Sequence, residues 1–237
     1  MLRAYLGLVV IAMMVAGCSG PRGGPPDLSP AMRDTFMKPV AKPGDIVAAE
    51  LAFARMAEEE GQWTAFREYA AEGAIMFDPA KVDARDWLKN RADPPVAVSW
   101  EPYEVWSSCD GSIGVTRGAY VKGDERGWYT TIWKRMPDGT HRWLLDHGQK
   151  DPAVPGPPEL IEAHIAECPE LPWSPTQELQ VGTPGQGEFF GGTSDDRTLR
   201  WGGRVDQWGG RIVTVDVWDG TQFQRVLHQT IAPPAKD

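Results

Sequence analysis

A change of hydrophobic period near residue 95 constrains the fold more than any other feature of the sequence. After Asp93-Pro94-Pro95 the apolar residues recur at every second position, in "VAVSWEPYEVWSS", "DGSIGVTRGAYVK", "GWYTTIWKRM" and "HRWLLDHG". A period of two is typical of strands, and the short connections "GDER" and "PDGT" favour antiparallel hairpins. Pro102 interrupts the first strand because proline cannot donate to a ladder. The sequence therefore predicts an antiparallel sheet up to about residue 149.

The segment before this sheet has the period of helices. Four apolar residues lie on one helix face, namely Ile46, Ala49, Phe53 and Met56. We expect Asp45 to cap this helix and Gly61 to end it. A second short helix follows with Trp63, Phe66 and Ala70 on one face, then a strand over 74–79 and one or two helical turns over 83–90. Helices followed by consecutive strands predict an α+β domain over 44–149, with the helices on one face of the sheet.

The chain after residue 149 changes composition twice. We interpret 150–197 as a link rich in proline and glycine, with one short helix on which Leu160, His164 and Cys168 share a face. In this link "GTPGQGEFFGGTSDD" is interpreted as a flexible loop. Residues 198–232 predict a small antiparallel β extension with strands at 198–206, 211–218 and 222–231. A sheet of that size rarely stands alone, so we expect it to pack on the first domain or on a partner chain.

The N-terminus has the pattern of a secretory signal. Met1-Leu2-Arg3 precedes the apolar run "AYLGLVVIAMMVA", which is too short for a transmembrane helix of about 20 residues. The run closes on Val15-Ala16-Gly17-Cys18, which resembles the lipobox of bacterial lipoproteins. This resemblance implies a signal peptide over 1–17, lipidation of Cys18, and a tether over 18–43 that holds the domain off a membrane. The alternative is a plain signal peptide with an incidental cysteine.

This interpretation of the N-terminus also predicts where the protein is located in the cell. A lipidated Cys18 predicts a bacterial cell-envelope protein that faces the periplasm, anchored to a membrane. Ser19 rather than Asp after the cysteine favours the outer membrane.

Two further cysteines, Cys109 and Cys168, remain in the chain. Since an extracytoplasmic compartment is oxidising, we expect them to form a disulfide. The alternative is two buried thiols that act as small apolar side chains.

Charge and metal-ligand spacing exclude some classes of function. The formal net charge of −9 comes without a basic run, which argues against a nucleic-acid surface. His164 and Cys168 are four residues apart on the predicted helix, but no second ligand pair accompanies them. We therefore expect no metal and no cofactor.

The first domain resembles the nuclear transport factor 2-like superfamily, particularly its SnoaL-like branch and related bacterial secreted proteins. The residues that carry the resemblance are "AFARMAEEEGQWTAFREYAAEGAIMFDP", "SIGVTRGAYV" and "GWYTTIWKRMPDGTHRWLLDHG", within 44–149. It implies a cone-shaped α+β fold in which a bent sheet wraps around helices. Enzymes of this superfamily include isomerases, cyclases and dehydratases with an acidic or histidine base in an apolar pocket. Because such folds host many functions, the resemblance implies no single activity.

Candidate pocket residues follow from strand alternation. Small residues at 114, 116 and 118 would lie beside aromatic ones at 129 and 133, which could leave a lined cavity. The candidates are Thr116, Tyr129, Thr131, Trp133, Asp146 and His147, and the other titratable residues considered are Asp78, Glu101 and Tyr103. Asp146 and His147 are consecutive, so their side chains should point to opposite faces of the strand. No pair of titratable residues has a spacing that demands catalysis, and the catalytic residues stay unknown.

Three functions remain open from the sequence. The first is a non-catalytic, lipid-anchored envelope protein whose cone-shaped domain binds a small apolar ligand or a protein partner, with a homodimer left open. The alternative is an enzyme of the isomerase, cyclase or dehydratase type with Asp146 or His147 as its base. The third is a structural envelope module whose C-terminal sheet docks onto cell-wall polymer or another subunit.

Overall fold

The computed structural model describes residues 40–156, 159–169, 179 and 187–233. The expected signal peptide, Cys18 and the tether up to residue 39 lie outside these residues. Within the described part of the chain, no helix has the length and apolar character needed to cross a membrane.

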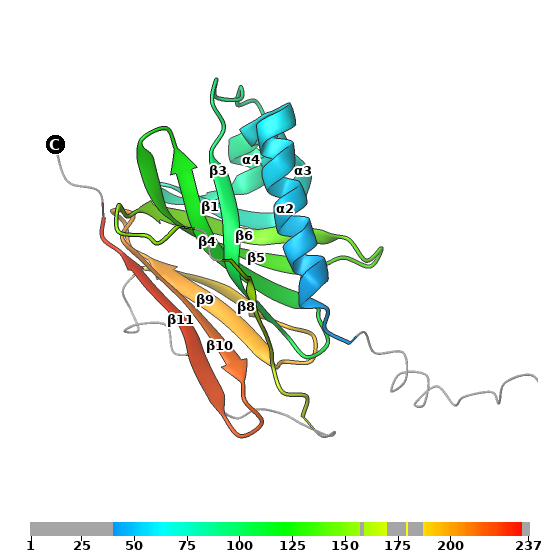
Figure 1. Ribbon diagram of the computed structural model, residues 1–237. Coiled ribbons are helices and arrows are strands. Elements are labelled where there is room, and N and C mark those ends of the chain that lie inside the picture. Colours follow the sequence, from blue (N-terminus) through cyan, green and yellow to red (C-terminus); the bar gives the residue numbers. More distant parts are fainter. Residues whose placement is uncertain (1–39, 157–158, 170–178, 180–186, 234–237) are drawn as a thin grey trace, which may run out of the picture. The chain divides into compact units, whose positions relative to one another are not determined.

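Three helices lie over one face of a large sheet (Figure 1): α2 (Pro43–Glu60), α3 (Gln62–Tyr69) and α4 (Ala84–Leu88). The expected cap is wrong, because the N-cap position is Lys42, three residues earlier, and Asp45 lies in the first turn of α2. Proline suits the first turn of a helix since its missing N–H would have no partner there. Gly61 ends α2 as predicted, at φ +118°, and a Cβ there would lie 2.4 Å from Cγ of Asp93.

The large sheet, sheet A, has seven strands: β1 (Ala70–Asp78), β2 (Ala80–Asp83), β3 (Ser99–Ser107), β4 (Ile113–Lys122), β5 (Glu125–Arg135), β6 (His141–Lys150) and β7 (Glu162–Ile165). Their order is β2-β1-β6-β5-β4-β3-β7. The sheet is mixed because β1 pairs in parallel with β6, and β3 with β7. The predicted α+β class is confirmed, and the break at Pro102 is a register shift between Pro102 and Glu104.

The helix expected near residues 159–168 is wrong. Residues 162–165 form strand β7, which pairs with the edge of β3 from Glu104↔Glu162 to Ser107↔Ile165. A helix confined between Pro158 and Pro169 would be too short to be stable alone, whereas the open edge of β3 offers backbone partners.

The C-terminal extension, sheet B, has four strands instead of the predicted three: β8 (Glu188–Thr193), β9 (Leu199–Val205), β10 (Arg211–Trp218) and β11 (Phe223–Ile231). They pair antiparallel in the order β11-β10-β9-β8. The extra strand β8 falls in the expected loop, because Gly191-Gly192 conceals its alternation. These glycines lie against β9, where a Cβ on Gly191 would be 2.5 Å from the carbonyl oxygen of Trp201.

Sheet B packs on the face of sheet A that the helices leave free. A shared core cluster joins Val115, Ile132 and Leu145 of sheet A with residues of sheet B such as Leu199 and Val213. The side-chain amide of Gln229 donates to Thr130 Oγ1 across this interface at 3.0 Å. The described part of the C-terminal extension is therefore docked on the first domain.

Cys109 and Cys168 form a disulfide, with their Cα atoms 5.3 Å apart. The bridge spans 59 residues, which in the chain-entropy model stabilises the fold by about 4 kcal/mol. It fastens the segment after β7 to the turn between β3 and β4. At the same turn Asp110 and Asp196 each accept the other's backbone N–H, at 3.0 and 2.8 Å, so that loops of both sheets are held together.

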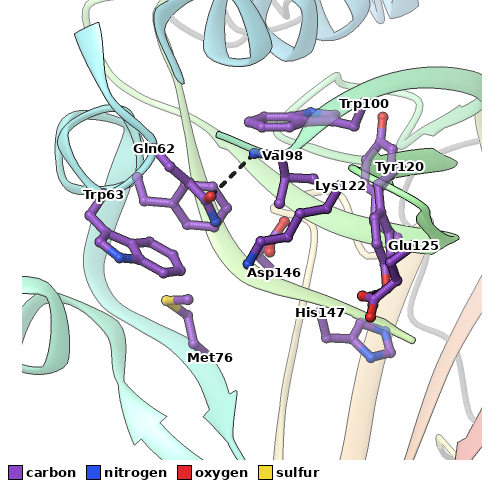
Figure 2. Close-up of a pocket in the computed structure, with 13 residues that line it drawn as sticks. Gln62, Trp63, Met76, Val98, Trp100, Tyr120, Lys122, Glu125, Asp146 and His147 are labelled. Atoms are coloured by element: carbon purple, nitrogen blue, oxygen red, sulfur yellow. Dashed lines mark hydrogen bonds between the residues drawn. The ribbon is translucent and has the colours of Figure 1, made fainter. Parts of the chain in front are cut away.

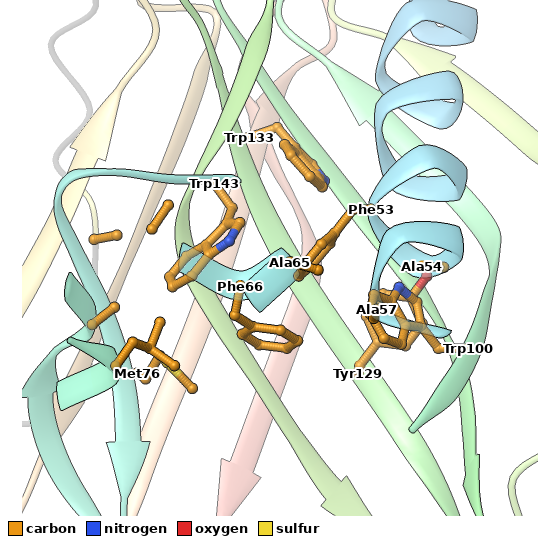
Figure 3. Packing of buried hydrophobic residues seen from close by; sticks show 14 of the residues in the cluster. Phe53, Ala54, Ala57, Ala65, Phe66, Met76, Trp100, Tyr129, Trp133 and Trp143 are labelled. Atoms are coloured by element: carbon orange, nitrogen blue, oxygen red, sulfur yellow. The ribbon is translucent and has the colours of Figure 1, made fainter. Parts of the chain in front are cut away.

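Beneath the helices, the core is built around aromatic rings (Figure 3). Phe53 of α2 lies at the centre, with its ring centroid 4.8 Å from those of Phe66 and Trp100 and 5.9 Å from that of Trp133. Trp133 and Trp143 are fully buried, and edge-to-face packing of such rings stabilises a core beyond the area that they bury.

Candidate functional site

One end of this core opens into a pocket of about 270 Å³ between α3, β3 and the strands β4 to β6 (Figure 2). Its apolar wall consists mainly of Trp63, Phe66, Met76, Val98, Trp100 and Tyr129. Its polar groups come from Gln62, Tyr120, Lys122, Glu125, Asp146 and His147. A concave site with aromatic walls and a few polar groups is what a small-molecule site requires.

Asp146 is one of two acidic residues that line this pocket, and Glu125 is the other. Asp146 lies opposite Thr131 in the β5–β6 register, and Thr131 Oγ1 donates to Asp146 Oδ2 at 2.9 Å. Burial raises the pKa of Asp146 to about 7, the Thr131 hydrogen bond opposes this shift, and the nearby Glu50 adds to it. A carboxyl with a pKa near neutral pH can both accept and release a proton under physiological conditions.

A second carboxyl, Glu50, lies behind the pocket and is completely buried on α2. It accepts hydrogen bonds from Trp100 Nε1 at 2.6 Å and Trp133 Nε1 at 2.9 Å, and also from the hydroxyl of Thr116. Burial raises the pKa of Glu50, and these hydrogen bonds act in the opposite direction. Glu50 was not predicted as a site residue, although its position four residues after Ile46 and three before Phe53 places it on the apolar face of α2.

Tyr129 brings a buried hydroxyl to the pocket. Its ring lies over Gly118, where a Cβ would be 2.5 Å from Tyr129 Cε1. Burial raises the pKa of Tyr129 well above its usual value, so the phenol is neutral at pH 7. Among the described residues its hydroxyl has no hydrogen-bond partner. A buried hydroxyl without a partner costs free energy.

The six predicted pocket residues fall into two groups. Tyr129, Asp146 and His147 line the pocket. Thr116, Thr131 and Trp133 do not line it, because they are fully buried behind the wall, where Thr116 and Trp133 bind Glu50 and Thr131 binds Asp146.

The other titratable candidates lie elsewhere. Asp78 accepts from Trp87 Nε1 at 2.7 Å, Tyr103 lies beneath the guanidinium of Arg117, and Glu101 is exposed. None of them lines this pocket.

His147 borders the pocket at its edge, but most of its ring lies on the other face of β6. Its ring contacts Phe77 and Trp128, with centroids 6.1 and 5.4 Å away. Burial and the positive charge of Arg211 lower the pKa of His147 to about 3. His147 is therefore neutral at pH 7, and its low basicity makes it a poor general base.

Only one trio of described residues could hold a metal ion, namely Glu104, Glu162 and His164, whose ligand atoms lie within 4.8 Å of one another. It lies at the β3–β7 edge, where the Arg117 guanidinium is already 3.9 Å from Glu104. The ligand pair His164 and Cys168 considered above does not form, because Cys168 is in the disulfide.

Comparisons with known proteins give a few distant structural neighbours. A ketosteroid isomerase-like protein from Parabacteroides distasonis has 18% identity and a TM-score of 0.37, covering 49% of this chain and 98% of that one. A DUF3225-family protein of unknown function from Pectobacterium atrosepticum has 13% identity and a TM-score of 0.35, with coverage of 46% and 90%. A ketosteroid isomerase-like protein from Kribbella flavida has 16% identity and a TM-score of 0.34, with coverage of 50% and 86%. No protein-family model and no curated protein matches the chain.

The Glu50 network leads to a stability prediction. Replacing Glu50 with Leu leaves the buried indole N–H of Trp100 without an acceptor, whereas Trp133 Nε1 keeps Thr116 Oγ1 at 3.0 Å. The loss should lower the free energy of unfolding by roughly 1–3 kcal/mol. Glu50→Gln keeps one carbonyl oxygen as acceptor and should cost clearly less. Urea unfolding of the three proteins measures both effects, and a Leu variant as stable as the wild type would contradict the role of Glu50.

Proposed function

We propose that the pocket binds a small, largely apolar molecule and that the domain is a nuclear transport factor 2-like binding module. The observation that carries this proposal is a pocket with aromatic walls that also contains the Asp146 carboxyl. Trp63, Phe66 and Trp100 offer ring surfaces to the body of the ligand. Tyr129 and Asp146 would bind one or two oxygen or nitrogen atoms and thereby orient it.

Proton transfer is the second candidate function, and the pKa of about 7 at Asp146 favours it. In this case the Asp146 carboxylate would remove a proton from a carbon next to a carbonyl, and Tyr129 would donate a hydrogen bond to the carbonyl oxygen as negative charge develops there. Of the two bases considered from the sequence, Asp146 suits this role and His147 does not, since its pKa is about 3. The reactions would be of the isomerase, cyclase or dehydratase type.

The cellular setting that we propose is the bacterial envelope. The lipobox-like residues 15–18 support a lipid anchor at Cys18, and the Cys109–Cys168 disulfide fits an oxidising compartment. The anchored domain would face the periplasm, with the outer membrane as the expected location. A protein partner or a second copy of the chain, bound to the surface of the domain, is the alternative to a small ligand in this proposal.

Filling the pocket tests the binding proposal. Val98→Trp places a large ring in the pocket wall, whereas Val96→Trp alters an exposed residue two positions earlier that does not line the pocket. With the neutral fluorescent probe N-phenyl-1-naphthylamine, we expect Val98→Trp to weaken binding by about tenfold or more, and Val96→Trp to have little effect. Equal affinity in all three proteins would contradict binding in this pocket.

Replacing Cys18 tests the anchor. In a bacterial host fed labelled palmitate, the wild-type protein should incorporate the label at Cys18. It should also fractionate with membranes, because more than one acyl chain gives stable anchoring. Cys18→Ala should remove the label and either release the protein or leave an uncleaved precursor. A wild-type protein without label would contradict the anchor and leave the pocket proposal unaffected.

A further inference from the structure

Lys122 is the cationic side chain of the pocket. It is the last residue of β4, opposite Glu125 in the β4–β5 hairpin, and strand alternation puts it on the same face as Thr116 and Tyr120. Figure 2 shows its side chain extending over the pocket, with the ammonium group directed to the side where Asp146 lies. The pocket therefore has a cation near its mouth and a carboxyl deeper in the sheet.

The charge of Lys122 is not neutralised by a neighbour. No ion pair or hydrogen bond of its ammonium group is formed within the described residues, where Asp146 binds Thr131 instead. Glu125, the residue opposite Lys122 in the hairpin, lies 3.6 Å from Lys150 Nζ and accepts from the hydroxyl of Tyr120 at 3.1 Å. Asp124 is exposed in the turn between them.

The remaining titratable groups around the pocket do not supply a matching negative charge at mildly acidic pH. Asp146 has a pKa of about 7, so it carries its proton at pH 6. His147, on the neighbouring position of β6, is neutral. Glu50 lies behind the wall, where its carboxyl is enclosed by the two indoles and Thr116. The pocket thus offers an apolar interior and one ammonium group that forms no ion pair with the described residues, in a chain whose net charge is −9.

We propose that the ligand of this pocket is an anion with an apolar ring body, such as an aromatic or alicyclic carboxylate, whose anionic group pairs with Lys122. This inference rests on the proposed binding function and narrows its ligand class. The ring body would lie among Trp63, Phe66 and Trp100, and the anionic group would stay at the mouth, where the β4–β5 hairpin holds the ammonium group. An anion at that position keeps part of its hydration, which makes its binding less costly than full burial of a charge.

Two fluorescent probes with the same ring system test this proposal. Anilinonaphthalene sulfonate is anionic, and N-phenyl-1-naphthylamine is its neutral counterpart. At pH 6 and low salt, the wild-type protein should bind the sulfonate more tightly, and Lys122→Met should weaken the sulfonate roughly twofold to fivefold while leaving the neutral probe unchanged. Lys122→Glu should weaken the sulfonate further, because it reverses the charge.

The matched control is Lys89→Met, which removes one positive charge from an exposed residue outside the pocket. It should leave both affinities unchanged.

If Lys122→Met changes the affinity for neither probe, or changes both affinities equally, the proposal is overturned. If Val98→Trp fails to weaken either probe, the binding function itself fails. If Val98→Trp blocks the neutral probe while the sulfonate is insensitive to both variants, only the anion proposal fails.

Discussion

The buried carboxyl of Glu50 joins helix α2 to sheet A through hydrogen bonds. Its oxygens accept from indoles on β3 and β5 and from a hydroxyl on β4, so one side chain of α2 is bound to three neighbouring strands. A buried carboxyl is stable only when its oxygens have such donors. This arrangement fixes the ring of Trp100, which is also a wall of the pocket. The stability of the helix–sheet contact and the shape of the pocket therefore depend on the same interaction.

Sheet A is covered on both faces, and this explains the opposite behaviour of two consecutive residues. Asp146 points to the helix side, where burial and Glu50 raise its pKa to about 7. His147 points to sheet B, where burial and Arg211 lower its pKa to about 3. Desolvation disfavours the charged form of each group. Glu50 acts on Asp146, and Arg211 acts on His147, in the same direction as desolvation. Of these two residues, only Asp146 can change its protonation state near neutral pH.

The sequence predicts the elements whose period is regular. The change of period near residue 95, the hairpin turns and the break at Pro102 all correspond to observed features of sheet A. Strand β7 was missed because Leu160, His164 and Cys168 have helical spacing, and only the open edge of β3 makes the segment a strand. Strand β8 was missed because its two glycines hide the alternation.

The site was predictable only in part. Strand alternation selects Tyr129 and Asp146, which line the pocket, and it also selects Thr116, Thr131 and Trp133, which lie deeper. Thr116 and Trp133 bind Glu50, and Thr131 binds Asp146. A single carboxyl in a helix gives no sign from sequence alone that three strands will supply donors to it. Lys122 was not predicted as a site residue because a lysine beside a hairpin turn is usually solvated. Its proposed role in binding an anion follows only from the pocket at that end of the sheet.

The ionisation of Asp146 tests the central claim most directly, because it depends on the burial of this carboxyl in the pocket and on the nearby Glu50. The carboxyl ¹³C chemical shifts of aspartate-labelled protein can be followed with pH by NMR, with Asp146→Asn to assign the resonance. We expect this resonance to titrate near pH 7. A midpoint near pH 4, the usual value for an exposed aspartate, would contradict a desolvated carboxyl in the pocket.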